Sequence, residues 1–294
     1  MSWADAFAKR ERRVLSRAEL LAMGATGASL TAAVRRGFLV RLRRDHYALP
    51  DTDNHVADAV RVGGRLGCVS ALADAGVFVL DSRFTHVCLS PLASRLRSPR
   101  SRFLPLTSTN RDGVELHWCE LLDPYGGTES SVSMCDALLQ SLDCQAEWLS
   151  VASFDSALYN GLVSLADVDR IFAAAPERHR HIGRLLDGRA ESGPESILRM
   201  IVVSAGYDFD LQVQMPGVGR VDMVVEGCLV VEADSRIGHA GWEKQRSDRS
   251  RDLELARRDF VTLRPVSEHI LYSPDAVRDA ITHLLMLNRR FSPR

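Results

Sequence analysis

Residues 219–264 read GRVDMVVEGCLVVEADSRIGHAGWEKQRSDRSRDLELARRDFVTLR, and the rest of the chain is interpreted outward from them. The pattern predicts two Val-rich strands joined by a tight turn, then a loop, a charged helix and a last strand. These strands nevertheless carry Asp222, Glu232 and Asp234. Because an ionised carboxylate in a buried strand needs a partner or a metal ion, the three acids are candidates for a metal site.

The register of this hairpin decides whether the acids meet. Side chains alternate along a strand, so Glu232 and Asp234 share one face. A two-residue turn would put Asp222 and Glu232 on opposite faces, whereas a three-residue loop at residues 226–228 would set them opposite each other. Gly227 at the centre favours the longer loop, or a bulge with the same effect. Clustered carboxylates repel one another unless a divalent cation lies among them, and oxygen ligands suit Mg²⁺ or Mn²⁺.

Length and composition predict a globular chain of about two or three domains. The protein has 294 residues, of which 46% are hydrophobic and 26% are charged. There is no apolar run long enough for a membrane span and no signal-peptide pattern at the charged N-terminus. The six cysteines show no C-x-x-C spacing, which is typical of reduced, mostly buried thiols. We therefore expect a cytoplasmic protein without a membrane partner.

The N-terminal segment is basic although the whole chain has a net charge of −1. Residues 1–50 contain ten Lys or Arg residues against four Asp or Glu residues. A basic segment on a nearly neutral chain indicates a module that binds a polyanion.

The same segment predicts the element order of a winged helix. Residues 16–19, SRAE, form a capping box that starts a helix, and this helix ends at Gly24. A second helix follows and ends at Gly37, before two short strands at residues 38–42 and 47–49. In a winged helix the second helix enters the major groove of DNA and the hairpin lies along the backbone.

Arginines near the end of the second helix and in the hairpin would contact phosphates, which give affinity but little sequence information. The alternative is a small helical domain with a solvated basic face. Because the charge lies on both predicted DNA-facing elements, the pattern favours DNA binding. The expected contacts are Arg35, Arg36, Arg41, Arg43 and Arg44.

Residues 51–190 indicate less about function. Residues 56–79 predict a mostly helical run, and residues 85–89 and 114–118 predict strands. His179 and His181 have no acid or cysteine beside them at ligand spacing, so we expect an exposed polar turn there.

The linker at residues 187–195 leads into a helix that carries Glu195 in its first turn. Ser192 is placed to cap this helix, and the helix is expected to end at Gly206. Beyond the hairpin, Asp248, Arg251 and Asp252 lie one turn apart on a charged helix. They form either ion pairs on a solvated face or, for Asp248 and Arg251, contacts that reach back to the acids.

With these residues in place, residues 191–264 resemble the very-short-patch-repair-like branch of the PD-(D/E)XK nuclease superfamily. Many of those proteins carry an acid on a helix, an Asp, a Glu-x-Asp-Gly, a His five residues later, and an Arg/Asp-rich helix before a last strand. Two residues depart from the pattern, because Ser235 replaces the Gly and Asp234 replaces the superfamily's common Lys. The matching residues are Glu195, Asp222, Glu232, Asp234, His239, Asp248, Arg251 and Asp252.

Residues 1–190 resemble the antitoxin of abortive-infection type IV toxin–antitoxin systems, whose winged helix binds its own promoter. The two resemblances together imply an α+β multidomain fold. A winged-helix DNA-binding domain is expected over 1–52, a mixed α/β middle domain over 53–188, and a restriction-endonuclease-like α/β domain with a mixed central sheet over 189–294. Double-stranded DNA and a cognate toxin are the partners that this implies.

By resemblance, Asp222 and Glu232, with Asp234, would hold Mg²⁺ or Mn²⁺ beside a scissile phosphate. His239 would act as general base or phosphate contact, and Glu195 as a supporting ligand. The usual Lys is missing, so His239 or Lys244 would replace it in activating water. The DNA contacts expected in this half are Lys244 and Arg251.

Three functions stay open at this point. The first is a metal-dependent DNA endonuclease targeted by a winged helix. The second is an antitoxin-like autorepressor in which the nuclease fold is inactive. The third is a repair nuclease that acts on branched or mismatched DNA.

Overall fold

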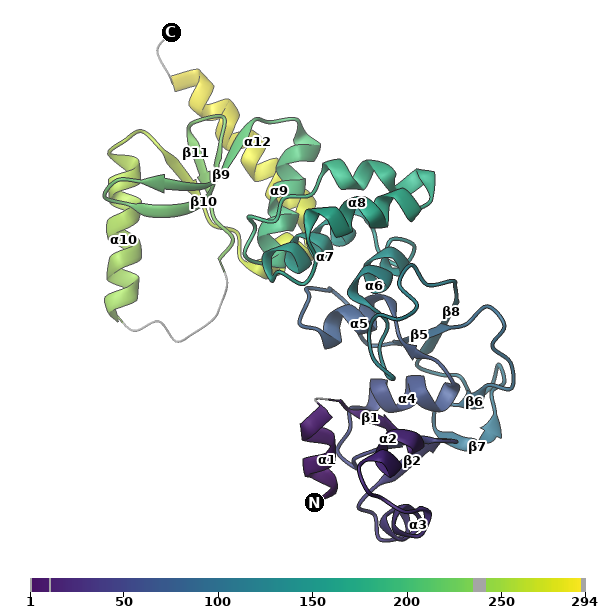
Figure 1. The fold of residues 1–294 in the computed structure, drawn as a ribbon. Coiled ribbons are helices and arrows are strands. Elements are labelled where there is room, and N and C mark those ends of the chain that lie inside the picture. Colours follow the sequence, from purple (N-terminus) through teal and green to yellow (C-terminus); the bar gives the residue numbers. More distant parts are fainter. Residues whose placement is uncertain (1, 11, 235–241, 292–294) are drawn as a thin grey trace. The chain divides into compact units, whose positions relative to one another are not determined.

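The structure is a computed structural model that describes the chain except residues 1, 11, 235–241 and 292–294 (Figure 1). Of residues 242–245, 247, 248 and 289–291 it describes the backbone alone. The described chain is mixed α/β, with helices and several small antiparallel and mixed sheets. None of the helices in these residues combines the length and apolar character needed to cross a membrane.

The chain divides into two compact units, whereas the sequence predicted three segments. Unit 1 comprises Met1–Gln145 and Val163–Arg180, and unit 2 comprises Ala146–Leu162 and His181–Arg294. The two units alternate along the sequence, because residues 146–162 belong to unit 2 although residues 163–180 belong to unit 1. The reason is that the helix Glu147–Tyr159 packs on the helix Gly193–Ala205, which lies beyond the predicted linker.

The two helices and two strands that residues 16–49 predicted are present in unit 1, together with a short strand at residues 14–16 that was not predicted (Figure 1). Ser16 caps α2 in a capping box, because its Oγ accepts the Glu19 N–H at 3.2 Å and Glu19 accepts the Ser16 N–H at 2.8 Å. Phe7, Leu20 and Leu39 lie in the core of this segment. Its three strands form a sheet in the order β1-β3-β2. The elements are α1 (Trp3–Arg10), β1 (Val14–Ser16), α2 (Arg17–Ala22), α3 (Gly27–Arg35), β2 (Val40–Arg43) and β3 (His46–Ala48).

The mostly helical run predicted over residues 56–79 consists of two helices that flank a short strand, which was not predicted. Gly63 ends the first helix with φ 115°, a conformation that glycine adopts without steric cost. Gly64 leaves no room for a side chain, because a Cβ there would lie 2.3 Å from the Cys88 carbonyl oxygen. The elements are α4 (Asn54–Val62), β4 (Arg65–Leu66) and α5 (Cys68–Asp74).

A three-stranded sheet in the order β4-β5-β8 forms the centre of the rest of unit 1. β5 and β8 run parallel, with Cys88 in register with His117. His179 lies on the 3-10 helix η1 and bonds Asp143 at 2.7 Å, so the predicted turn is a short helix with a carboxylate partner. The elements are β5 (Thr85–Leu89), β6 (Arg97–Ser98), β7 (Ser101–Pro105), β8 (Val114–Trp118), α6 (Met134–Ser141), α8 (Leu165–Ala174) and η1 (Glu177–Arg184).

Unit 2 is built on a four-stranded mixed sheet in the order β12-β11-β10-β9 (Figure 1). β9, β10 and β11 are antiparallel, whereas β12 runs parallel to β11. Val221, Val224 and Val230 pack with Leu255 of α10 in the core of this unit. The elements are α7 (Glu147–Tyr159), α9 (Gly193–Ala205), β9 (Phe209–Met215), β10 (Gly219–Val225), β11 (Leu229–Val231), α10 (Trp242–Ala256), β12 (Val261–Leu263), α11 (Ser267–Tyr272) and α12 (Pro274–Phe291).

Both predicted ends of α9 are confirmed. Ser192 accepts the Glu195 N–H at 3.4 Å, and Gly206 ends the helix with φ 74°. This cap fixes the first turn of α9, which carries the Glu195 side chain.

Candidate acidic site and a cysteine–histidine cluster

The β10–β11 hairpin has the three-residue loop that the sequence favoured. Val225 pairs with Leu229 and Met223 pairs with Val231, so residues 226–228 form the loop. Continuing this register by one pair sets Asp222 opposite Glu232. The sequence prediction for the register is therefore confirmed.

Asp222 lies in an environment that opposes its ionisation. Burial raises the pKa of this carboxyl to about 6, and the nearby Glu195 and Glu232 carboxylates also raise it. One hydrogen bond lowers the pKa of Asp222, since its Oδ2 accepts the Ala233 N–H at 3.0 Å. Clustered carboxylates with a raised pKa are typical of functional sites and of cation sites.

Glu195 faces the same small cavity as Asp222 and is held by polar contacts. Glu195 Oε1 accepts the Ser192 hydroxyl at 2.8 Å, and Oε2 accepts the Gln212 side-chain N–H at 3.1 Å. The structure thus places a helix acid and a strand acid at the same cavity.

Gln212 is a residue of this site that the sequence did not indicate. Its φ of 52° is unusual for a residue other than glycine, and it falls where the β9–β10 pairing skips Asp222. Its Oε1 is buried and has no hydrogen-bond partner in the described part of the chain. Local backbone strain and an unpaired polar atom beside two carboxylates point to a site built for a ligand.

Both carboxylate oxygens of Glu232 form salt bridges with arginines. Its Oε1 accepts from Arg251 Nη2 at 2.8 Å and its Oε2 accepts from Arg264 Nε at 2.6 Å. Arg264 also pairs with Asp252 at 2.8 Å. The sequence left open whether Arg251 forms ion pairs on a solvated helix face or reaches back to the acids. The structure shows that it reaches back to Glu232.

Four other predicted residues lie apart from these contacts or have side chains outside the described atoms. Asp234 is exposed, and its backbone bridges to Val266 at the end of the sheet. His239 falls within residues 235–241, which the structure does not describe, and the side chain of Lys244 is likewise not described. The side chain of Asp248 also lies outside the described atoms.

The residues at this site fit a hard divalent cation. Glu195, Asp222 and Gln212, which carry carboxylate and amide oxygens, line one small cavity. Oxygen donors of this kind suit Mg²⁺ and Mn²⁺ rather than softer metals. The orphaned Oε1 of Gln212 adds a neutral donor to the set.

The arginines of the N-terminal segment are not equivalent. Arg35 and Arg36 at the end of α3 and Arg44 in the β2–β3 turn are exposed. Arg43 is half-buried and donates from Nη1 to the Val62 carbonyl at 3.0 Å, and burial lowers its pKa. Arg41 is also half-buried, and its Nε has no hydrogen-bond partner among the described residues.

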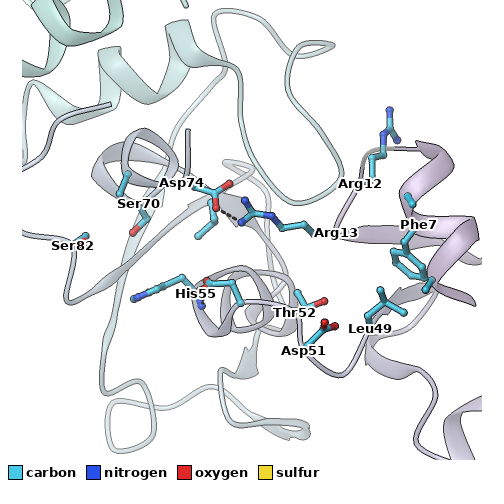
Figure 2. Close-up of a pocket in the computed structure, with 15 residues that line it drawn as sticks. Phe7, Arg12, Arg13, Leu49, Asp51, Thr52, His55, Ser70, Asp74 and Ser82 are labelled. Carbon is cyan, nitrogen blue, oxygen red and sulfur yellow. Dashed lines mark hydrogen bonds and ion pairs between the residues drawn. The ribbon is translucent and has the colours of Figure 1, made fainter. Parts of the chain in front are cut away.

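A wide cavity in unit 1 was not predicted. It measures about 820 Å³ and is open on one side. Figure 2 shows Arg13 and Asp74 paired across it, with Phe7 and His55 among the lining residues. Its lining mixes apolar groups with both signs of charge and so indicates no ligand class.

A cluster of cysteine and histidine side chains was also missed in the sequence. All six cysteines are free thiols, as expected, yet four of them gather near two histidines of unit 1. Four potential metal-ligating atoms of this group all lie within 4.8 Å of one another, so the group can hold a metal ion. We call the four residues the Cys/His cluster: Cys68, His86, His117 and Cys144.

No family model matches this sequence, and no curated protein matches it significantly. The chemistry of the two sites is therefore the basis for assigning a function.

Proposed function

We propose that the protein binds double-stranded DNA through an N-terminal winged helix and hydrolyses DNA phosphodiester bonds at a Mg²⁺- or Mn²⁺-dependent site in unit 2. This unit would be an endonuclease domain of the PD-(D/E)XK type. The observation that carries the proposal is the hairpin register, which sets Asp222 opposite Glu232 while Glu195 faces Asp222.

The roles of the acids follow from their contacts. Asp222 and Glu195 would hold the cation, because their charges repel each other without one. Gln212 would position Glu195 through the bond to Oε2. When bound, the cation supplies Lewis-acid polarisation of the phosphate and a lowered pKa of coordinated water.

Arg251 and Arg264 would orient Glu232 and balance its charge. Both oxygens of Glu232 accept from these arginines, and an oxygen that accepts one bond still has a lone pair for a cation. Glu232 would therefore complete the site at its edge.

DNA binding is supported by the N-terminal segment. The order α1–β1–α2–α3–β2–β3 with a short terminal hairpin supports the assignment of a winged helix. Arg35, Arg36 and Arg44 are exposed on the two elements that contact DNA in that fold. Arg43 has a structural role instead, because it bonds to the end of α4.

The test is cleavage of plasmid and linear duplex DNA by the full chain with Mg²⁺ or Mn²⁺. Asp222→Asn and Glu195→Gln should each reduce cleavage by at least about 100-fold, since even the outer partners of a metal site cost about 10–100-fold. Asp210→Asn is the matched control, because Asp210 is an exposed carboxylate on β9 of the same sheet. Equal nicking by the wild type and both site variants would refute the proposal.

The second candidate is a DNA-binding regulator whose nuclease fold is not catalytic. It is favoured by the two arginines that occupy both oxygens of Glu232. Specific duplex binding without cleavage in either metal, together with a toxin gene beside the coding gene, would support this candidate. If cleavage is found, a comparison of perfect duplex, mismatched duplex and single strands would show whether the substrate is a repair substrate.

A further inference from the structure

The Cys/His cluster draws its side chains from separate elements of unit 1. His86 lies on β5 and His117 on β8, and their rings stack with centroids 5.1 Å apart and an interplanar angle of 14°. His86 Nδ1 and His117 Nε2 face each other at 2.9 Å. Without a metal, one of these nitrogens must carry a proton, whereas with a metal both can present lone pairs to it.

The two thiols complete the group. Cys68 is the first residue of α5 and has φ 50°, a strained conformation for a residue with a side chain. Cys144 follows α6 and is exposed, and its Sγ lies 3.9 Å from His117 Nε2.

We propose that the Cys/His cluster is a structural zinc site. Two sulfur and two nitrogen donors form the Cys₂His₂ set that Zn²⁺ favours, and thiolates exclude the harder Mg²⁺. Tetrahedral Zn²⁺, with bonds of about 2.3 Å to sulfur and about 2.0 Å to nitrogen, needs donors about 3.3–3.8 Å apart. The N···N separation of 2.9 Å and the S···N separation of 3.9 Å each lie within about 0.5 Å of the tetrahedral value.

Hydrogen bonds hold the segments that present these donors. The Cys68 N–H donates to Gln140 Oε1 at 3.0 Å, so α5 is tied to α6. The His86 N–H donates to Ser70 Oγ at 2.8 Å, and the Gly67 N–H donates to the His86 carbonyl at 3.0 Å, which ties α5 to β5. Such surrounding bonds are the usual support of metal ligands.

The role of the site follows from its closed donor set. Four protein ligands leave no position for substrate, which is typical of structural and not catalytic zinc. The ion would join α5, β5, β8 and the turn after α6. The proposal is independent of nuclease activity, since its donors are of another class and all lie in unit 1.

A neighbouring thiol pair provides a matched control. Cys88 Sγ and Cys119 Sγ lie 3.4 Å apart, and the Gln140 side-chain N–H contacts both at 3.4 and 3.2 Å. The hydrogen-bond partners of these two thiols are each other and the Gln140 side chain. They lie beside the proposed site but outside its four donors.

The experiment measures zinc in the reduced full chain, purified without chelator and again after removal and reloading of the metal. The expected result is about one equivalent of Zn²⁺ per chain, and Co²⁺ in its place should give the visible absorption of a tetrahedral thiolate site. Cys144→Ser should lose both signals, and it should still fold because Cys144 is exposed. Cys119→Ser should keep both signals.

Thermal unfolding gives a second readout that does not depend on DNA cleavage. Zn²⁺ should raise the unfolding temperature of the wild type and of Cys119→Ser, but not that of Cys144→Ser or His117→Ala. The proposal is overturned if the reduced wild type takes up no zinc. It is equally overturned if Cys144→Ser and His117→Ala bind zinc as the wild type does, or if a Cys68–Cys144 disulfide is the native state.

Discussion

At the scale of single residues, Asp222 carries a strong electrostatic conflict. Its carboxyl is removed from water, and two other carboxylates lie near it. The counteracting bond from the Ala233 N–H does not offset these effects, so the pKa stays near 6. A group with this pKa changes its charge close to neutral pH, which makes its proton and a cation competitors for the same oxygens.

We predict that Glu195→Gln lowers the pKa of Asp222 in the metal-free protein. Removing a negative neighbour favours the ionised form, so the direction is downward, while the remaining burial keeps the pKa above its ordinary value of 3.8. Carboxyl-selective NMR titration measures the shift. Divalent-cation binding by the wild type should correspondingly weaken as the pH falls through about 6. An unchanged or higher pKa in Glu195→Gln would show that the two side chains do not interact.

At the scale of elements, the α7–α9 contact fixes where unit 2 begins. Asp155 and Arg199 form an ion pair at 2.7 Å with side chains only 0% and 5% exposed. Asp155 Oδ1 also accepts the Asp187 N–H at 2.7 Å. Burial raises the pKa of Asp155, and the charge of Arg199 opposes that shift. The pair therefore joins two helices that lie on either side of the predicted linker.

We predict that Arg199→Met destabilises unit 2 by about 3–5 kcal/mol, because it leaves a buried carboxylate without its partner. Asp155→Leu combined with Arg199→Met should cost less than the single change, since no buried charge is left unpaired. Chemical denaturation followed by circular dichroism measures both.

The matched control for that comparison is Arg189→Met. Arg189 pairs with Asp187 at 2.7 Å, but its side chain is 62% exposed, so its loss should cost only about 0–1 kcal/mol. Equal losses for Arg189→Met and Arg199→Met would show that the buried pair has no special role.

At the scale of the whole molecule, the charges of the chain are segregated along its sequence. The first 50 residues carry a surplus of positive charge, with ten Lys or Arg against four Asp or Glu, whereas the acid cluster around Asp222 lies in unit 2. A polyanion would be attracted to the first segment and repelled by the second unless cations are bound there. Under the proposed function, this segregation would make DNA binding dependent on salt and cleavage dependent on metal.

We predict that Arg35→Ala/Arg36→Ala weakens duplex binding and lowers its dependence on salt. Each lost phosphate contact should reduce the slope of log K against log salt concentration by about 1. Fluorescence anisotropy at several salt concentrations measures the slope. Arg111→Ala is the control, because Arg111 is an exposed arginine of unit 1 outside the basic segment. An unchanged slope in the double variant would argue against the winged-helix assignment.

The sequence alone determined the local features of this protein. The caps at Ser16 and Ser192, the stop at Gly206 and the three-residue loop that aligns Asp222 with Glu232 all depend on residues close together in the chain. Side-chain periodicity and cap chemistry act over a few residues, which is why these features could be predicted. The break at Gly63 is the exception, since the helical pattern on both sides of it masked a strand.

The tertiary structure alone decided which distant residues meet. The Cys/His cluster, the arginines on Glu232, the bond from Gln212 to Glu195 and the Asp155–Arg199 pair all join separate elements. Their spacing in the sequence carries no regular pattern, because it is set by the lengths of the intervening helices and loops. Such contacts depend on how the helices and strands pack, and the free energy of that packing is spread over the whole core.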